Sequence, residues 1–583
     1  MATLNETYVN ALLADATYAA DLANGDTGGA LAGKLRTRMT PALADFIAAN
    51  FEVAAHKESD DTFGSGFDAT AWRGKAGTAY AGKVYVSMQG TTGLGDFLAD
   101  LDLSTSGGAT AQFVDMVNWW FQITTPAGQA ARQIILSPTP GKYFQEAAAG
   151  VGTGLLLGVS RVEVNGHSLG GHLASAFARV FGGSLGIDRV STFNSAGFTP
   201  LSALVFNDLE AVLRTGAGRY LSEKQDNYFA NHGINVTTNS FFSSQIGRRV
   251  NLFNENSSVQ VPNHFMYKLT DSLALAAAME KLDPSLTTSR ANALFEAGSN
   301  SAGASIEGVM NGLRRLLLDP KAGDLPVGDV SDSAASRLVY HATLKQLSDS
   351  AALQSLIGKA QIDLSGVGLA SSARNDFASL LSLITLSPVA LKAIAGNEAA
   401  VEAALSTAWG STYAAWQADQ AMTQAERDAG KETYTQNYLD DRAVMASWMV
   451  YRNTKDITDA TITGTNTGDN LFRDFGGSAI TTIRVGSLTT GDSDRRQFLF
   501  GGDGAETLNG ANKSDRLYGG AGADILNGQG GADHLEGNAG NDQLNGGTGN
   551  DTYRERRLED ALGALRTVFI ESASNDAVLA CAA

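Results

Sequence analysis

The sequence of 583 residues predicts an α/β domain built on a mainly parallel sheet, then a helical segment, and a parallel β-roll at the C-terminus. Three observations support this prediction. A strand-like run at Val162–Val164 leads into a glycine-rich turn and a helix, an order typical of α/β folds. Ala, Leu and Ser recur with helical spacing from about Leu269 to Trp448, and nine-residue units repeat from Gly501 to Tyr553.

These patterns divide the chain into four predicted segments. We expect the α/β domain with N-terminal helices over 1–275, a helical cap or bridging region over 276–460, the roll over 461–553, and a C-terminal segment over 554–583. Up to about Phe67 the N-terminal segment is predicted to form helices that precede the sheet. We find no motif there that suggests chemistry.

Composition excludes several classes of protein. The chain has 43 Lys and Arg against 61 Asp and Glu, a formal charge of −18, whereas nucleic-acid binding needs basic clusters. The single cysteine, Cys581, excludes an intramolecular disulfide framework and a cysteine-based zinc site. Met1–Gly25 lacks the basic start and apolar run of a secretory signal, and no apolar stretch reaches the roughly 18 residues of a membrane span. We therefore expect a soluble protein that, if exported, needs no N-terminal signal.

The strongest catalytic motif is the run Gly166-His167-Ser168-Leu169-Gly170-Gly171. A strand, this pentapeptide motif and a helix of small residues together form the nucleophile elbow of an α/β hydrolase. Small residues fit because the turn is tight and the helix must pack closely against the strand. We expect Ser168 to be the nucleophile and the amide of Leu169 to face a developing oxyanion.

A second oxyanion donor is expected after an earlier strand. Lys83–Met88 alternates as a strand does, and Gln89-Gly90-Thr91-Thr92 follows it. This loop resembles that of the class 3, fungal-lipase-like family, in which an Arg-Gly-Ser/Thr motif follows the strand. The resemblance implies that Thr91 supplies oxyanion donors from its amide and hydroxyl, and that the substrates are lipid esters. Two residues depart from the family pattern, Gln89 in place of Arg and Phe97 in place of Trp.

The general base is expected among the histidines that follow Ser168, because the triad of this fold has the order Ser, acid, His. His172 lies on the elbow helix, where a later acid cannot easily orient it, and His232 lies in a polar loop. His264 lies in a loop before the helix that would close the sheet domain. We therefore predict His264 as the base, with His232 as the alternative.

The triad acid has several candidates. Glu255 follows a convincing strand, Val250–Phe253, and a Glu can orient an imidazolium as an Asp does. In the class 3 family an Asp precedes a Val-Pro-containing run, and here Asn256 has that place with Glu255 beside it. We predict Glu255, ahead of Asp226 and Asp208. The remaining candidates are Asp188, Glu210 and Glu223.

Lipid contact has two candidate regions. A lid or lipid-contacting helix in the helical middle would give aggregated ester substrates an apolar surface. The aromatic run Val117–Phe121 is the other candidate, but its neighbours in sequence place it in the helix between the oxyanion and nucleophile strands. We therefore expect that run to lie in the core.

The nine-residue units predict calcium binding. Gly permits tight turns between very short strands, Leu fills a thin core, and a column of carboxylates needs a cation within it. A looser unit from Gly464 suggests an earlier start, and Ala511 and Ser514 replace glycine in the second unit, which predicts weaker binding there. The predicted ligands are Glu506, Asp515, Asp524, Asp533, Asp542 and Asp551, and the predicted core leucines are Leu508, Leu517, Leu526, Leu535 and Leu544.

This segment resembles the repeats-in-toxin (RTX) proteins that Gram-negative bacteria export by type I secretion. The resemblance implies several Ca²⁺ ions in the roll, folding of the roll in external calcium, and an exporter as partner. In that family an uncleaved C-terminal segment addresses the exporter, and the ending Phe569–Ala583 is compatible with such a segment.

Together the motifs predict a secreted, calcium-requiring serine ester hydrolase that acts through an acyl-enzyme. The class 3 resemblance implies triacylglycerols or the acyl chains of phospholipids as substrates, with transient contact to a lipid surface. The alternative is a calcium-binding secreted or surface protein whose hydrolase half is a non-catalytic scaffold, and a peptidase on the same fold is a third hypothesis. The triad discriminates between them, because a scaffold has no need for Ser168, His264 and two oxyanion loops in this order.

Overall fold

The computed structural model describes two compact units. Unit 1 comprises Met1–Glu280, Thr287–Asn292 and Val327–Lys345, and unit 2 comprises Lys281–Leu286, Ala293–Pro326 and Gln346–Ala583. The four segments predicted from the sequence are a finer division, which stays a prediction. The described residues are 2–58, 65–90, 109–199, 202–214, 222–232, 245–255, 264–300, 304–327, 337–428, 430–454, 461–462, 468–477, 480–488, 491–555, 568–570 and 577–580.

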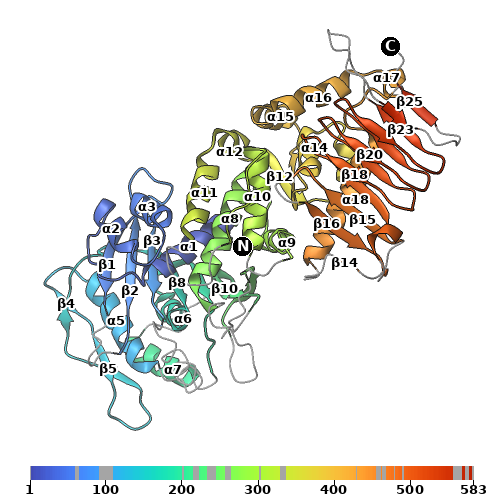
Figure 1. Cartoon of the computed structure of the whole chain (residues 1–583). Coiled ribbons are helices and arrows are strands. Elements are labelled where there is room, and N and C mark those ends of the chain that lie inside the picture. Colours follow the sequence, from blue (N-terminus) through green and yellow to red (C-terminus); the bar gives the residue numbers. More distant parts are fainter. Residues whose placement is uncertain are drawn as a thin grey trace. The chain divides into compact units, whose positions relative to one another are not determined.

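A seven-stranded sheet is the framework of unit 1 (Figure 1). Its order is β1-β2-β3-β8-β9-β10-β11; the strands from β3 to β11 are parallel, whereas β2 is antiparallel to both of its neighbours. Parallel strands end at the same edge of a sheet, so the loops after β3, β8, β9, β10 and β11 share one edge. The strands are β1 (Phe51–Lys57), β2 (Ala69–Gly74), β3 (Val84–Met88), β8 (Arg161–His167), β9 (Gly186–Phe193), β10 (Gln225–Ala230) and β11 (Arg248–Leu252).

Helices cover this sheet, which explains why β3 is buried throughout and β8 is buried at every residue except the first. Helix α6 (Leu169–Phe181) packs on β3, β8 and β9, and α5 (Thr110–Thr124) packs on α6. The α5 residue Trp120 meets Phe177 of α6 edge to face, with ring centroids 4.9 Å apart. Trp119 and Trp120 are 4 % and 5 % exposed, so the prediction that the aromatic run lies in the core is confirmed.

The N-terminal segment is only partly helical, so the prediction of helices up to Phe67 was wrong for β1. Three helices precede that strand: α1 (Leu4–Ala16), α2 (Gly28–Leu35) and α3 (Pro41–Asn50). In β1, Phe51 and Val53 are buried and Glu52 between them is more exposed, but Ala54 and Ala55 are both buried where the pairing with β2 shifts register. The two adjacent alanines interrupt the alternation that would predict a strand, so the sequence there also fits a helix.

Smaller elements complete unit 1. Two short antiparallel pairs, β4 (Ala130–Ala131) with β7 (Gly150–Val151) and β5 (Ile134–Leu136) with β6 (Phe144–Glu146), lie between α5 and β8 in the sequence. The other elements are α7 (Ser202–Leu213), the 3₁₀ turn η1 (Ser222–Lys224), most of α8 (Met266–Leu282), part of α9 (Thr288–Glu296) and most of α11 (Leu338–Asp349).

Unit 2 begins with helices, but the expected helical middle also contains a strand pair. Strands β12 (Ala360–Leu364) and β13 (Val389–Ala393) are antiparallel, and Ile362 pairs with Leu391. Both side chains are fully buried, because β-branched and leucine side chains pack this two-stranded element against the helices. The helices are α10 (Ser305–Leu317), α12 (Ala351–Leu356), α13 (Leu369–Ser372), α14 (Phe377–Ile384), α15 (Glu398–Ser406), α16 (Gly410–Ala421), α17 (Gln424–Asp428) and α18 (Gln436–Thr454).

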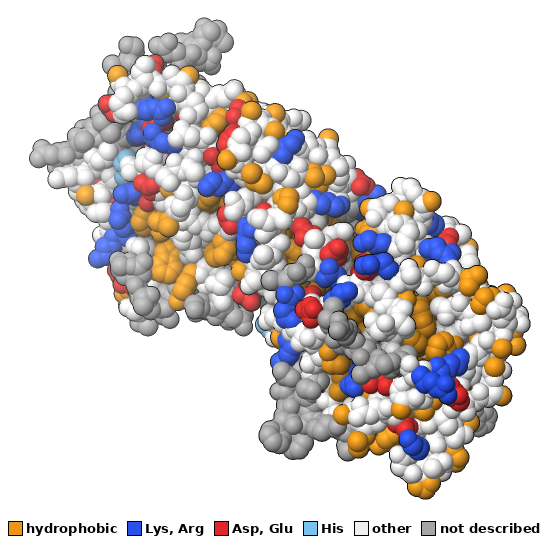
Figure 2. Space-filling view, turned by 180° about the vertical axis from the view of Figure 1, so that it is seen from behind, with side chains coloured by type: hydrophobic (Ala, Val, Ile, Leu, Met, Phe, Trp, Pro, Cys, Tyr) orange, Lys and Arg blue, Asp and Glu red, His pale blue; other side chains and the backbone are white. Residues whose placement is uncertain are grey.

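None of the helices in the described residues combines the length and the hydropathy that crossing a bilayer requires. On the face shown in Figure 2, basic and acidic side chains are interspersed, and apolar side chains gather in separate patches between them.

The C-terminal strands form two parallel stacks, consistent with a β-roll, drawn in orange to red in Figure 1. Within the repeats, successive strands alternate between the stacks, so neighbours within a stack are 18 residues apart, as in the pairing of β19 with β21. The last strand of each stack pairs with a strand 25 residues earlier. One stack contains β17 (Arg496–Phe500), β19 (Arg516–Tyr518), β21 (His534–Glu536), β23 (Thr552–Glu555) and β25 (Ala577–Ala580); the other contains β18 (Thr507–Asn509), β20 (Ile525–Asn527), β22 (Gln543–Asn545) and β24 (Val568–Ile570).

The roll has a core one side chain wide. Its buried residues are Leu499, Leu508, Leu517, Leu526, Leu535, Leu544 and Tyr553, each at most 1 % exposed, and they include all five predicted leucines. The repeats are preceded by β14 (Thr461–Ile462), β15 (Asn470–Asp474) and β16 (Thr481–Val485), and β15 pairs in parallel with β17. The sheet therefore starts before the regular repeats, and β24 and β25 extend it into the segment 554–583 that was expected to carry the export signal.

Candidate active site and calcium site

Ser168 lies in the turn that joins β8 to α6, at the carboxyl edge of the sheet. Its backbone has φ 55° and ψ −124°, a conformation that is costly for a residue with a side chain and that surrounding contacts must hold. The Ser168 amide donates to the carbonyl of Phe193 at 2.9 Å, and the Ser168 carbonyl accepts from the Gly171 amide at 3.1 Å. The turn is therefore held both by the neighbouring strand β9 and by the first turn of α6.

Glycines around this turn allow two loops to approach each other. A Cβ at Gly170 would overlap the carbonyl oxygen of Met88, the last residue of β3, and a Cβ at Gly166 would overlap the carbonyl oxygen of Gly170. A Cβ at Gly90 would lie 3.1 Å from the Cβ of Ser168. The loop after β3 therefore passes directly beside Ser168, as the oxyanion prediction requires.

Gly170→Ala is expected to lower the free energy of unfolding of unit 1 by about 2 kcal/mol, because the added methyl group collides with backbone rather than with a movable side chain. Scanning calorimetry of the full chain measures the change. Gly33→Ala is the matched control, since a Cβ on Gly33 of α2 meets nothing within 4 Å; it should leave stability unchanged or raise it. Similar losses in both variants would contradict the close approach.

His264 is buried beside the elbow, where it is 4 % exposed. Its ring centroid lies 4.8 Å from that of His167, the residue before Ser168. The His264 carbonyl accepts from His167 Nε2 at 3.0 Å and from the side chain of Asn194, which follows β9, at 2.8 Å. Burial lowers the pKa of His264 to about 4, so the ring is neutral at pH 7, as a general base must be.

Glu255 follows β11, so the structure places it on the same edge as Ser168. It is 7 % exposed, and its carbonyl accepts from Lys268 Nζ at 2.8 Å. Its carboxylate lies 4.0 Å from Nη1 of Arg337, which also pairs with Asp271 at 2.6 Å. Glu255 is thus a buried carboxylate beside a cation, and its role as the triad acid stays a prediction.

The other acidic candidates occupy different places. Asp226 and Asp188 lie near the amino ends of β10 and β9, away from the edge where these strands end, and they pair with Arg248 and Arg161. The carboxylate of Asp208 accepts from the amides of Tyr143 and Phe144. Glu210 pairs with Arg179 at 3.0 Å, and Glu223 lies in η1, before β10 begins. Topology therefore favours Glu255 among the candidates.

Two other histidines lie between Ser168 and His264 in the sequence, His172 and His232. His172 packs in the core between Phe113 and Phe198, with ring centroids 5.9 Å and 4.3 Å away. His232 follows β10, and its backbone amide donates to the side chain of Asn254 at 2.9 Å. His232 therefore lies on the correct edge, whereas His172 has the surroundings of a core residue.

The structure describes one of the two predicted oxyanion donors, Leu169. Leu169 is the first residue of α6, so its amide is one of the N–H groups that a helix leaves without an intrahelical partner. Thr91 lies outside the described residues, which end on that loop at Gly90.

Tyr18 is a residue of this site that sequence analysis missed. Its hydroxyl oxygen lies 3.1 Å from His167 Nδ1 and accepts from the Gly90 amide at 2.8 Å. It precedes His167 by 149 residues, in a segment without any motif. The only signal for its role is the spatial contact, which the order of residues does not contain.

The acidic residues of the roll form a ladder between turns. Four of the six carboxylates accept, through Oδ1, from the amide of the acidic residue 18 positions earlier. These hydrogen bonds measure 2.7–2.8 Å and join Asp524 to Glu506, Asp533 to Asp515, Asp542 to Asp524 and Asp551 to Asp533. One oxygen of each carboxylate therefore fixes the spacing of the turns.

The second oxygens of Asp524 and Asp533 fit a cation. Both Oδ2 atoms are buried and accept no hydrogen bond from the described residues. Burial raises the pKa of each carboxyl to about 7, because the backbone hydrogen bond that each accepts offsets only part of the cost of a buried charge and acidic neighbours add to that cost. Ca²⁺ would offset it, because this ion takes carboxylate and carbonyl oxygens as ligands. No three metal-binding side chains converge in the described part of the chain, so backbone carbonyls would have to complete each site.

The second unit of the repeat differs in this respect. At Asp515 the Oδ2 atom accepts a hydrogen bond of 2.5 Å from the amide of Ala511, one of the two residues that replace glycine there. A cation would have to compete with this amide. Glu506 of the first unit accepts in the same way from the amide of Gly502 at 3.1 Å, so this bond does not depend on the replacement of glycine, and weaker binding in the second unit stays a prediction.

Comparison with known proteins identifies the roll. A family model described as the RTX calcium-binding nonapeptide repeat, in four copies, matches residues 500–535 and 522–553. No curated protein matches the chain. The match covers the acidic ladder and the five core leucines from Leu508 to Leu544, and it does not extend to unit 1. The C-terminal part of this chain therefore consists of RTX calcium-binding nonapeptide repeats, which imply a secreted calcium-binding protein.

Proposed function

We propose that this protein is a secreted, calcium-requiring serine hydrolase of carboxylic esters, with lipid esters as substrates. The observation that carries the proposal is the strained backbone of Ser168 between β8 and α6, with His264 buried beside it. A strained serine at the carboxyl edge of a parallel sheet is the geometry of a nucleophile elbow. We assign unit 1 to the α/β-hydrolase fold and its loops to the class 3 type on this basis.

The proposed reaction uses residues that follow three strands, β3, β8 and β11, at one edge of the sheet. Ser168 attacks the acyl carbon while His264 takes its proton, and Glu255 orients the imidazole. Amides of Leu169 and Thr91 stabilise the negative charge on the tetrahedral intermediate. The alcohol leaves with the proton from His264, and water then releases the acyl group from Ser168 by the same steps. Triacylglycerol lipase and phospholipase A1 activities both fit this chemistry.

Calcium has a structural role in this proposal. Asp524 and Asp533 would hold it, with turn carbonyls as further ligands, and its charge would offset the buried carboxylates. The proposed nucleophile and base lie in unit 1, so calcium supports the roll and not the chemical step. Export by type I secretion follows from the RTX repeats as part of the same proposal.

A non-catalytic scaffold is the second candidate, and one observation favours it. The Glu255 carboxylate faces Arg337, within a buried cluster that includes Asp271 and His341. An acid held by an arginine stabilises the fold without any catalytic role.

Hydrolysis of p-nitrophenyl esters, from acetate to palmitate, in millimolar calcium distinguishes the two. We expect turnover, with a preference for longer acyl chains if lipids are the substrates. A correctly folded protein that hydrolyses none of the series would favour the scaffold.

A further inference from the structure

A continuous chain of hydrogen bonds runs through the proposed site without including Ser168. The Gly90 amide donates to the hydroxyl of Tyr18 at 2.8 Å, and that hydroxyl lies 3.1 Å from His167 Nδ1. On the other side of the ring, His167 Nε2 lies 3.0 Å from the carbonyl of His264. The chain therefore joins the loop after β3 to the loop that carries the proposed base, through the residue next to the nucleophile.

The chemistry of the partners fixes the direction of every bond. A carbonyl oxygen can only accept, so His167 Nε2 must carry the hydrogen. In the neutral ring Nδ1 is then the acceptor, and the Tyr18 hydroxyl must donate to it. The same hydroxyl accepts from Gly90 through its lone pair. The donor and the acceptor of each bond are therefore fixed, so the hydrogens of the network have a single arrangement while the ring of His167 is neutral.

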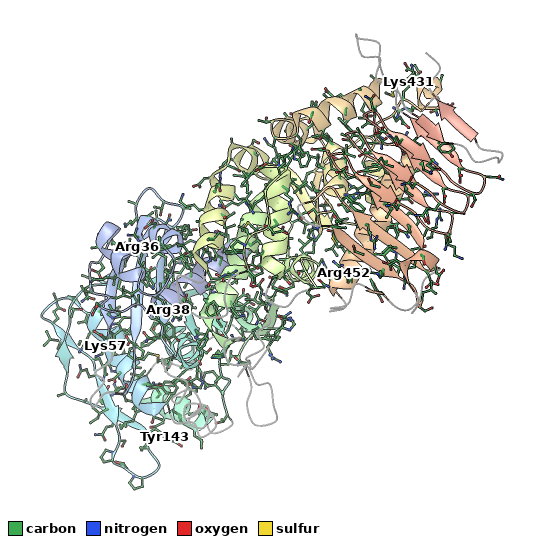
Figure 3. The ribbon with its side chains drawn as sticks, in the orientation of Figure 1. Arg36, Arg38, Lys57, Tyr143, Lys431 and Arg452 are labelled. Atoms are coloured by element: carbon green, nitrogen blue, oxygen red, sulfur yellow. The ribbon has the colours of Figure 1, made fainter. Side chains whose placement is uncertain are left out.

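The surroundings hold Tyr18 in place. The guanidinium of Arg38, labelled in Figure 3, lies 5.1 Å from the centre of the Tyr18 ring, and it pairs with Asp15 at 2.8 Å. A Cβ at Gly90 would approach the Tyr18 hydroxyl to 2.8 Å, so the backbone can come this close only because residue 90 is glycine. His167 itself is 5 % exposed.

We infer that Tyr18 and His167 are positioning residues for the hydrolytic site, which set the places of the oxyanion loop and of the His264 loop on either side of Ser168. The inference rests on the proposed function. The N-terminal segment that contains Tyr18 would thus contribute to catalysis through these two loops. Neither side chain takes part in bond making.

Tyr18→Phe removes only the hydroxyl and thus tests the inference. We expect kcat for a p-nitrophenyl ester to fall about tenfold or more, with KM within about twofold, because misplaced catalytic groups act on the transition state more than on substrate binding. Tyr228→Phe is the matched control. The Tyr228 hydroxyl of β10 lies 3.0 Å from the hydroxyl of Thr7 in α1, so this bond joins the N-terminal segment to the sheet but involves neither of the two loops. This variant should lower the melting temperature and leave kcat unchanged.

A second pair of variants keeps the test independent of the stability of Tyr18→Phe. His167→Gln retains a side-chain N–H for the His264 carbonyl, whereas His167→Ala retains none. We expect His167→Gln to keep several times more activity than His167→Ala at similar melting temperature. Equal activity of these two variants would overturn the inference.

The outcomes separate the inference from the proposed function. Wild-type kcat in Tyr18→Phe, together with loss of turnover in Ser168→Ala, would overturn the positioning role and leave the hydrolase intact. Wild-type protein without any Ser168-dependent turnover would overturn the proposed function and, with it, this inference.

Discussion

Ser168→Ala is expected to reduce ester turnover by roughly four to six orders of magnitude, to a level near the uncatalysed rate. Loss of a serine nucleophile removes the covalent route altogether, and the remaining oxyanion donors recover only a small part of the rate. The fold should persist, because the strained turn is held by backbone hydrogen bonds, in which Ser168 donates to Phe193 and accepts from Gly171, and not by the hydroxyl. Steady-state kinetics with p-nitrophenyl esters measure the loss, and calorimetry verifies the fold.

Ser195→Ala is a matched control for this variant. Ser195 is fully buried on the same sheet edge, and its hydroxyl contacts only the carbonyl of Ala196 among the hydrogen bonds described for it. We expect turnover within a few-fold of wild type. Comparable loss in Ser195→Ala would indicate that damage to the edge, and not loss of the nucleophile, explains the effect.

The base can be tested in the same assay. His264→Ala should lose nearly as much activity as Ser168→Ala, whereas His232→Ala should lose little. Because burial lowers the pKa of His264 to about 4, the neutral base persists well below pH 6.5, and the acid limb of the kcat/KM profile should lie near pH 4. Retained activity in His264→Ala would transfer the role to His232 and remove the support for Glu255.

Removal of calcium is expected to unfold the roll, over residues of about 464–553. The core cluster of the repeats holds only seven buried side chains, one from each turn, and is too thin to stabilise them alone. Ionised Asp524 and Asp533 add the cost of buried charge, and each saturated calcium site would contribute about 2.7 kcal/mol at a hundredfold excess over Kd. Far-UV circular dichroism with a chelator should therefore show loss of strand signal, and calorimetry should show loss of one transition.

Two variants test whether the buried carboxylates of the roll bind the calcium that folding requires. Asp533→Ala should raise the calcium concentration needed for folding, whereas Asp503→Ala, at a side chain that is 80 % exposed, should not change it. Ester turnover should fall less than the strand signal, because no calcium ligand is proposed in unit 1. Unchanged thermal stability in the chelator would contradict the calcium-dependent roll.

Much of the roll was predictable because its period is contained in the sequence. The recurrence of Asp and Leu at ninth positions fixes turns, strands and core, and all five predicted leucines are buried. The elbow was predictable for a similar reason, since the glycines at 166, 170 and 171 have no space for a side chain. In both the roll and the elbow, the local sequence determines the local backbone geometry.

Other features depend on contacts between distant residues. Strand β1 and the pair β12 and β13 were missed because short apolar runs rich in Ala and Leu fit helix and strand equally well. Tyr18 acquires its role only from the approach of Gly90 and His167. The sequence alone does not identify the triad acid either. The surroundings of Glu255 include Arg337, which lies more than 80 residues later in the chain.

Covalent labelling with a fluorophosphonate, followed by mass spectrometry of the peptides, tests the central claim most directly, because it needs no knowledge of the substrate. In calcium we predict one adduct, on Ser168, which is absent from Ser168→Ala and slow to form in His264→Ala. A folded, calcium-loaded protein that carries no adduct, or carries it on another residue, would contradict the assignment of unit 1 as a serine hydrolase.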